Sequence, residues 1–230
     1  MKAADVMVSA VIGVRPNARV EEVAKILLAN HISAVPVLDE EGELLGIVSE
    51  GDLMRRPEAG TERRRSWWLE QLTGKQVLAA EYVKSHSHKV SDVMTRAVVT
   101  ATPDTPLGEI ATLLEKKRIK RVPIVQNGKV VGIVSRANLL QALATMPVND
   151  TADAHSNDSE IREKVLSLLN GERWRPALLN VTVHDGNVDL WGFVTSNDEK
   201  KAARIAIEGV VGVKSINDHL TIPPPETAMV

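Results

Sequence analysis

Two short phrases carry the side chains best suited to hold a ligand. GIVSEGDL places Ser49 three positions before Asp52, and the later phrase GIVSRANL places Ser135 three positions before Asn138. A carboxylate only accepts hydrogen bonds, so Asp52 can bind two neighbouring hydroxyl groups of a ligand at once. Asn138 offers a single carbonyl acceptor, which predicts binding weaker by about 1–2 kcal/mol.

The same residues also have a purely structural interpretation. A Ser-x-x-Asp sequence between a strand and a helix is typical of a helix N-cap, and Asn caps a helix as well as Asp does. In that interpretation Asp52 and Asn138 are interchangeable caps with no ligand. Both interpretations remain open at the level of the sequence.

The two phrases end two copies of an internal repeat. DVM at 5–7 recurs at 92–94, and ISAVPVLDEEGELLGIVS at 32–49 aligns with IKRVPIVQNGKVVGIVS at 119–135. In each copy an apolar stripe at helical spacing precedes two strands joined by a turn. The stripes are Val20, Val23, Ala24, Leu27 and Leu28, and Leu107, Ile110, Ala111 and Leu114.

Each repeat is therefore expected to be a β-α-β-β-α unit of about fifty residues, which is small for an independent core. We expect the two units to pack as a pseudo-symmetric pair. The chain is thus assigned to the α/β (α+β) class.

The C-terminal part has a different pattern. NVTVHDGNVDLWG alternates apolar and polar residues around Asp185-Gly186, which predicts a hairpin. A helical stripe that includes Ile161, Val165, Leu168 and Leu169 precedes it. Ser196 opens a second helix, and VGVKSINDHLTI is typical of a last strand. The predicted order is α-β-β-α-β.

These motifs resemble known families. The DVM start, the I-x-x-V-P-V/I strand and the G-I-V-S-x-x-D/N turn, each present twice, resemble a pair of CBS domains, called a Bateman module. The V-x-V-x-D-G-x-V-x-L-x-G-x-V and G-V-x-x-I-N-D-x-L patterns resemble a BON domain. The expected organisation is CBS domain 1 at 1–56, an inter-CBS helical insert at 57–87, CBS domain 2 at 88–147, a linker at 148–157, the BON domain at 158–222 and a tail at 223–230.

The resemblance implies two clefts between the CBS units, each able to hold an adenosine nucleotide. The favoured cleft uses Ser49, Asp52, Val98, Val99, Ile119, Lys120 and Arg121. The second, weaker cleft uses Val11, Ile12, Ile32, Ser33, Ala34, Ser135 and Asn138. Lys120 and Arg121 could bind phosphate, because a guanidinium donates two parallel hydrogen bonds, or they could be a solvated basic pair.

The resemblance also implies a function. The chain is expected to be a non-catalytic regulatory protein in signal transduction that binds AMP, ADP, ATP or NAD, with no obligatory cofactor. It would form a homodimer and pass its bound state through the BON domain to a protein or phospholipid partner.

Two other functions stay open. One is a membrane- or envelope-associated BON-type binding protein whose CBS pair only holds a dimer together. The other is a nucleic-acid-binding regulator that uses the basic and aromatic residues of the insert, although interspersed Glu residues disfavour nucleic acid. Those insert residues are Arg63, Arg64, Arg65, Trp67 and Trp68.

Composition narrows these choices. The net charge of −2 gives no general attraction to nucleic acid, and the absence of Cys excludes thiol catalysis and zinc–thiolate sites. No apolar run reaches the roughly 20 residues that span a bilayer, so a cytoplasmic protein is expected. No nucleophile motif is present, and His86 and His88 lack further ligands nearby in the sequence, so neither catalysis nor a metal site is expected.

Overall fold

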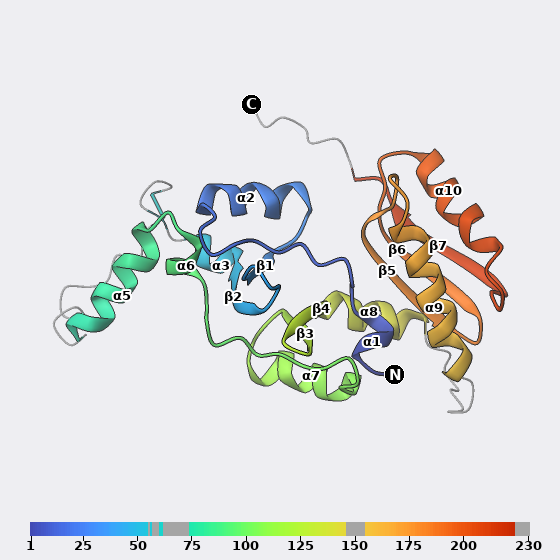
Figure 1. The fold of residues 1–230 in the computed structure, drawn as a ribbon, viewed down its shortest axis with the longest axis horizontal. Coiled ribbons are helices and arrows are strands. Elements are labelled where there is room, and N and C mark those ends of the chain that lie inside the picture. The colour runs from blue at the N-terminus through green and yellow to red at the C-terminus, as the bar shows by residue number, and fades with distance from the viewer. Residues whose placement is uncertain (55, 57–59, 62–73, 146–154, 224–230) are drawn as a thin grey trace. The chain divides into compact units, whose positions relative to one another are not determined.

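The computed structural model describes residues 1–54, 56, 60–61, 74–145 and 155–223 (Figure 1). The chain divides into two compact units, and each contains most of one repeat. The second-repeat unit also contains the C-terminal domain. The first-repeat unit comprises Ile12–Val99 and Asn127–Val130, and the second-repeat unit comprises Met1–Val11, Thr100–Gln126 and Val131–Val230.

In the first-repeat unit, helix α2 packs on the hairpin of β1 and β2. The strands are antiparallel, and Ala34 lies opposite Ser49. Val23 and Leu27 of α2 are buried as their spacing predicts, but Leu28 is 70% exposed, so the apolar stripe is narrower than expected. The elements are α2 (Val20–Ala29), β1 (Ala34–Leu38), β2 (Leu44–Ser49), α3 (Glu50–Leu53), α5 (Lys75–His86) and α6 (Val90–Val93).

The second repeat has the same order of elements. Ile110 and Leu114 lie in its core with Val122, Ile124 and Val134 of the hairpin. Its elements are α7 (Leu107–Lys116), β3 (Arg121–Gln126), β4 (Lys129–Ser135) and α8 (Arg136–Thr145), and α1 (Ala3–Val6) of the first repeat belongs to the same unit. The two hairpins therefore confirm the strands expected from the repeated sequence.

The first strand expected in each repeat is reduced to a single parallel bridge. Val14 pairs with Val37, and Ala101 pairs with Ile124. Each bridge adds one edge contact to the hairpin of its own repeat. The repeat is still a mixed α+β unit, with a shorter first strand than its sequence suggested.

The DVM segments are exchanged between the repeats. Met7 of the first repeat covers Gly132 of the second, and Met94 of the second covers Gly46 of the first. A Cβ at Gly46 would lie 2.7 Å from the Met94 sulfur, and one at Gly132 would lie 2.5 Å from the Met7 sulfur. A larger residue in place of either glycine would therefore force this methionine to move.

The C-terminal domain is a three-stranded sheet with two helices, in the predicted order. β5 and β6 are antiparallel and β6 and β7 are parallel, with β6 central. Side chains of both helices and of the sheet form one buried apolar core. Figure 1 shows where the two helices lie beside the sheet. The elements are α9 (His155–Asn170), β5 (Ala177–His184), β6 (Asn187–Phe193), α10 (Asn197–Glu208) and β7 (Ser215–Thr221).

The hairpin of this domain turns where the sequence predicted. Asp185 and Gly186 both have positive φ, at 50° and 76°, as a two-residue turn of this type requires. Asp158 on α9 accepts hydrogen bonds from both of their backbone N–H groups, at 2.7 and 2.8 Å. One buried carboxylate thus fixes the turn against the helix.

Candidate functional site

The first candidate turn joins β2 to α3. Asp52 accepts hydrogen bonds through Oδ2 from the Ser49 backbone N–H at 3.0 Å and from the Ser49 hydroxyl at 2.7 Å. Since α3 begins directly after Ser49, this is the capping geometry of the structural interpretation. The turn therefore holds the Ser49 hydroxyl and the Asp52 carboxylate side by side.

The other oxygen of Asp52 also has a partner. Its Oδ1 lies 2.6 Å from the Lys84 ammonium of α5. The Asp52 side chain is 12% exposed and that of Lys84 is 44% exposed, so the pair lies at the border of the solvent. Sequence reasoning missed Lys84, because it lies outside the repeat and no motif marks it.

The second candidate turn joins β4 to α8. Asn138 accepts through Oδ1 from the Ser135 backbone N–H at 2.8 Å and from the Ser135 hydroxyl at 2.7 Å. Its Nδ2 donates to Oε1 of Gln141 at 3.1 Å, and Asn138 as a whole is 4% exposed. The amide uses both an acceptor and a donor, and an ionised carboxylate in its place would have no N–H to donate.

The structure divides the residues predicted for the favoured cleft between the units. Ser49 and Asp52 belong to the first-repeat unit together with Val98 and Val99, both partly buried. Lys120 is exposed, and its backbone carbonyl accepts from the Arg136 N–H at 3.2 Å. Ile119, Lys120 and Arg121 belong to the second-repeat unit.

The residues predicted for the second cleft are divided in the same way. Ser135, Asn138 and Val11 belong to the second-repeat unit. In the first-repeat unit the Ser33 carbonyl accepts from the Glu50 N–H at 3.0 Å, beside the first turn. Ile12, Ile32, Ser33 and Ala34 all belong to that unit.

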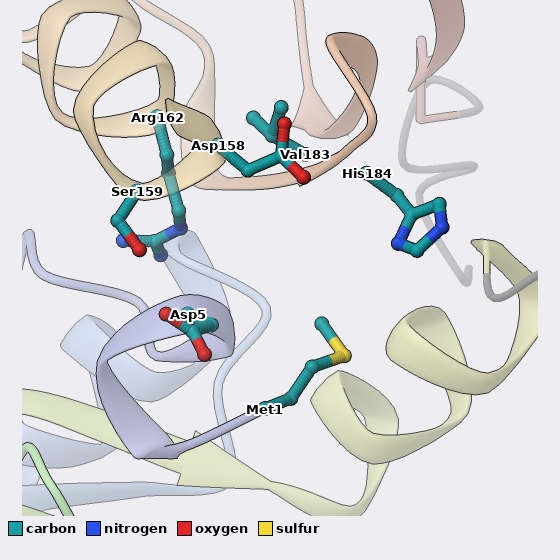
Figure 2. A pocket seen from close by; sticks show the side chains of 7 residues that line it. All are labelled: Met1, Asp5, Asp158, Ser159, Arg162, Val183 and His184. Carbon is teal, nitrogen blue, oxygen red and sulfur yellow. The ribbon is translucent and has the colours of Figure 1, made fainter. Parts of the chain in front are cut away.

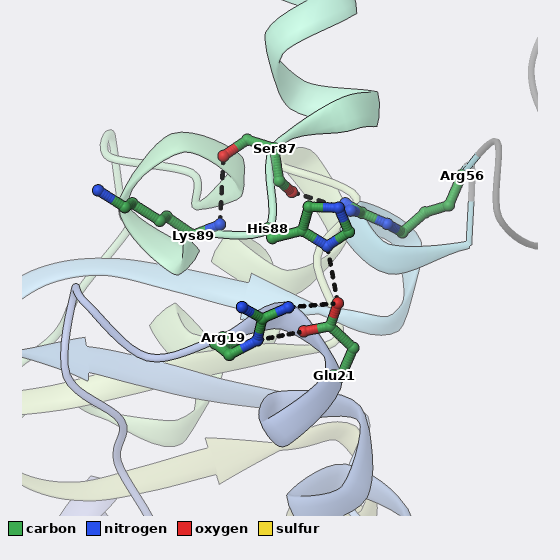
Figure 3. A network of polar contacts seen from close by, with 6 residues as sticks. All are labelled: Arg19, Glu21, Arg56, Ser87, His88 and Lys89. Carbon is green, nitrogen blue, oxygen red and sulfur yellow. Dashed lines mark hydrogen bonds and ion pairs between the residues drawn. The ribbon is translucent and has the colours of Figure 1, made fainter.

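A polar network lies at the base of α5 (Figure 3). Glu21 pairs with Arg19 at 3.2 Å and with Nδ1 of His88 at 2.7 Å. Its own backbone N–H, His88 and Arg19 stabilise the carboxylate and lower the pKa of Glu21 to about 2. Buried Arg56 donates to the Ser87 carbonyl at 2.9 Å, which holds the chain that leads out of α5.

The two histidines considered for a metal site have other contacts. His88 pairs with Glu21, and the His86 ring stacks on Tyr82 with centroids 3.8 Å apart. Across residues 1–54, 56, 60–61, 74–145 and 155–223, no group of three or more His, Asp or Glu side chains could hold a metal ion. In the same ranges no helix is long and apolar enough to cross a membrane.

A small cavity lies between α1 and α9 (Figure 2). Its volume of about 20 Å³ admits about one water molecule and excludes a nucleotide. Arg162 reaches from α9 into this region and donates to the Val181 carbonyl at 2.7 Å and the Met7 carbonyl at 2.8 Å. Burial lowers the pKa of Arg162 to about 10, and Asp5 partly opposes that shift.

The basic and aromatic residues proposed for nucleic-acid contact lie outside the described residues. They are Arg63, Arg64, Arg65, Trp67 and Trp68. The other two tryptophans lie in the C-terminal domain. Trp174 packs against the core, and Trp191 stacks on His219 with ring centroids 3.9 Å apart.

The described residues form two hairpin-and-helix repeats with matching Ser-x-x-Asp and Ser-x-x-Asn turns, followed by a small α-β-β-α-β domain. This architecture defines a tandem-repeat protein with a separate C-terminal module. Comparison with known families agrees with that class. The CBS domain matches residues 3–59 and 90–145, and the BON domain matches residues 157–224. The chain belongs to the CBS-domain family and carries a C-terminal BON domain.

Relatives match the CBS part of the chain. An uncharacterized protein of Methanocaldococcus jannaschii is 35% identical over 133 residues, which are 53% of this chain and 79% of that protein. The chloroplastic CBS domain-containing protein CBSX1 of Arabidopsis thaliana is 32% identical over 135 residues, 56% of this chain and 57% of its own length.

A solved structure of similar fold contains a ligand. It is the crystal structure of CBSX2 in complex with AMP, which superimposes with a TM-score of 0.55 at 26% identity. The match covers 63% of this chain and 97% of the other chain. CBSX2 thus binds AMP on a fold that this chain shares.

Proposed function

We propose that the protein is a non-catalytic regulatory protein that binds an adenosine nucleotide at its CBS pair and passes the bound state to a partner through the BON domain. The observation that carries the proposal is the pair of turns, each with a serine hydroxyl 2.7 Å from the carboxylate or amide oxygen three residues later. The AMP complex of CBSX2 supports an adenosine ligand for this fold.

The chemistry of the first turn suits a ribose. Asp52 can accept from both hydroxyls of the diol, and such charge-assisted hydrogen bonds are stronger than those to a neutral acceptor. A carboxylate has about four lone-pair sites, so Asp52 can keep its hydrogen bonds to Ser49 while it accepts from the ligand. The Lys84 ammonium then competes with the ribose for Oδ1.

The remaining residues of each proposed site follow the expectation from the family. Val98, Val99 and Ile119 would contact the base and sugar, and Lys120 and Arg121 would bind phosphate in the favoured site. The second site would combine Ser135 and Asn138 with a less polar wall, which favours weaker binding. AMP, ADP, ATP and NAD all carry the adenosine group that this proposal requires.

Regulation would follow from differential affinity. A ligand shifts an equilibrium between two arrangements only by the difference in its affinity for them. The proposal includes a homodimer, because CBS pairs commonly dimerise. The partner reached through the BON domain would be a protein or a phospholipid surface.

Isothermal titration calorimetry with AMP, ATP and NAD tests the proposal. Asp52→Ala is expected to weaken nucleotide binding at least tenfold, and Asn138→Ala is expected to weaken it less. Glu41→Ala is the matched control, because Glu41 is an exposed acid in the turn between β1 and β2. Equal losses in the Asp52 and Asn138 variants would contradict the assignment of the favoured site, and no binding by the unchanged chain would contradict the function.

A further inference from the structure

The second turn is connected to the BON domain through Gln141 of α8. Gln141 lies one turn beyond Asn138 on α8, and its Oε1 accepts from Nδ2 of Asn138 at 3.1 Å. The same oxygen accepts from Nδ2 of Asn180 on β5 at 2.8 Å. A continuous chain of side chains thus runs from Ser135 through Asn138 and Gln141 to Asn180.

Asn138 and Asn180 are buried, whereas Ser135 and Gln141 are partly buried. Asn180 and Thr182 alternate along β5 and point to the same face of the sheet, and each is 1% exposed. Thr145, one helical turn after Gln141, lies with its hydroxyl 3.4 Å from that of Thr182. Because the amides of Asn138 and Asn180 are shielded from water, solvent does not readily replace a hydrogen bond that either amide loses.

A second contact joins the BON domain to the N-terminal segment that is paired with β4. Arg162 on α9 of the BON domain donates to the Met7 carbonyl at 2.8 Å and is 7% exposed. The next residue, Val8, pairs with Ile133 of β4, and the segment continues to Val11, which is expected to contact the second ligand. BON side chains therefore contact both Gln141, which is the partner of Asn138, and the segment that leads to Val11.

The first turn lacks this arrangement among the described residues. Asp52 occupies the position that corresponds to Asn138, and its Oδ1 pairs with Lys84 of α5. The difference between Asp and Asn in the two repeats thus has a physical reason. Asn138 donates to the Gln141 oxygen that Asn180 also uses, and an ionised carboxylate at that position could not donate to it.

We propose that the second turn is the site whose occupancy the BON domain senses, and that Asn138, Gln141 and Asn180 are the positioning residues that couple them. The inference rests on the proposed binding of adenosine nucleotides and adds which of the two sites communicates with the output domain. A ligand on Ser135 and Asn138 fixes the Asn138 amide, and the shared Gln141 oxygen passes that constraint to β5. Thermodynamic coupling is reciprocal, so if ligand binding orders β5, a change that orders β5 strengthens ligand binding at the second turn by the same free energy.

One substitution of Gln141 is expected to break this chain of hydrogen bonds, and a conservative one is expected to preserve it. Gln141→Met keeps a similar length but removes the acceptor, so the amides of Asn138 and Asn180 both lose a partner. Gln141→Glu keeps an oxygen that accepts from both amides and is expected to preserve coupling. Asn180→Leu cuts the same chain from the BON side, and Thr145→Val removes a neighbouring contact without touching the amides.

The experiment is backbone hydrogen exchange of the full chain with and without AMP. It is done in the Asp52→Ala background, so that AMP acts at the second turn, at concentrations shown by calorimetry to saturate. AMP is expected to slow exchange in β5 (Ala177–His184) at least threefold in this background, in the Gln141→Glu variant and in the Thr145→Val variant. The slowing is expected to vanish in Gln141→Met and in Asn180→Leu.

The outcomes separate this inference from the proposed function. If the unchanged chain binds no adenosine ligand by calorimetry, the proposed function fails. If the unchanged chain binds AMP but the Asp52→Ala chain does not, only the sensing role of the second turn is overturned. Slowing of β5 that persists in folded Gln141→Met or Asn180→Leu chains would likewise overturn the coupling through Gln141.

Discussion

Lys84 is expected to weaken ligand binding at the first turn, so its removal should strengthen it. The Lys84 ammonium lies 2.6 Å from Oδ1 of Asp52, the oxygen that is not hydrogen-bonded to Ser49. A ribose diol that binds this carboxylate must displace the ammonium or share the oxygen with it. Lys84→Met keeps most of the aliphatic side chain and removes only the competing charge.

The expected magnitude follows from the exposure of the pair. The side chains are 44% and 12% exposed, so solvent screens much of the attraction, and a pair at such a border contributes about 1 kcal/mol. If the ligand must break the ion pair between Lys84 and Asp52, the Lys84→Met chain binds without that cost, and its binding free energy becomes more favourable by the same amount. One kcal/mol corresponds to about a fivefold gain in affinity.

Calorimetry with adenosine is the appropriate assay, because adenosine carries the diol but no phosphate that could bind Lys84. The matched control is Lys75→Met, which removes an exposed charge from the first turn of the same helix. Adenosine binding that is unchanged or weaker in Lys84→Met, with Lys75→Met neutral, would refute the competition between Lys84 and the ribose.

Two further predictions concern stability. Hydrogen bonds from its own backbone N–H, from His88 and from Arg19 depress the folded pKa of Glu21 to about 2 from an ordinary value of about 4.5. These contacts therefore stabilise the fold above pH 4.5, and their contribution is lost as the pH falls toward 2. The difference in melting temperature between the unchanged chain and Glu21→Gln should shrink over that range, and a constant difference would contradict the role of the charge. Gly46→Ala should lower the free energy of unfolding in urea by about 1–3 kcal/mol, because its Cβ would lie 2.7 Å from the Met94 sulfur. Gly108→Ala in α7, with nothing within 4 Å, should instead raise it by about 0.5–1 kcal/mol, and equal effects of the two changes would argue against the close approach at Gly46.

Much of the local structure could be predicted from the sequence, because periodicity and turn residues report on it directly. Alternation around Asp185-Gly186 predicted the hairpin that β5 and β6 form, and the repeated I-x-x-V-P and GIVS phrases predicted β1 to β4. The serine caps were also predictable, because Ser-x-x-Asp and Ser-x-x-Asn are local patterns. Leu28 was the exception in its helix, since spacing cannot say how wide the covered face is.

Contacts between distant residues could not be predicted in this way. Nothing local links Lys84 to Asp52, Gln141 to Asn180, or Arg162 to the Met7 carbonyl. Each joins elements that only the tertiary fold brings together. The Asp-to-Asn change between the repeats was visible in the sequence, but its second hydrogen-bond partner was not.

The exchange of Met7 and Met94 has a consequence for how the chain can be divided. A fragment that stops before residue 88 retains Gly46 but loses the methionine that shields it, and the complementary fragment has Gly132 without Met7. Neither piece contains a complete CBS-repeat core, although each contains most of one copy of the duplicated sequence. Separate fragments are therefore expected to recover these two methionine contacts only when they are mixed.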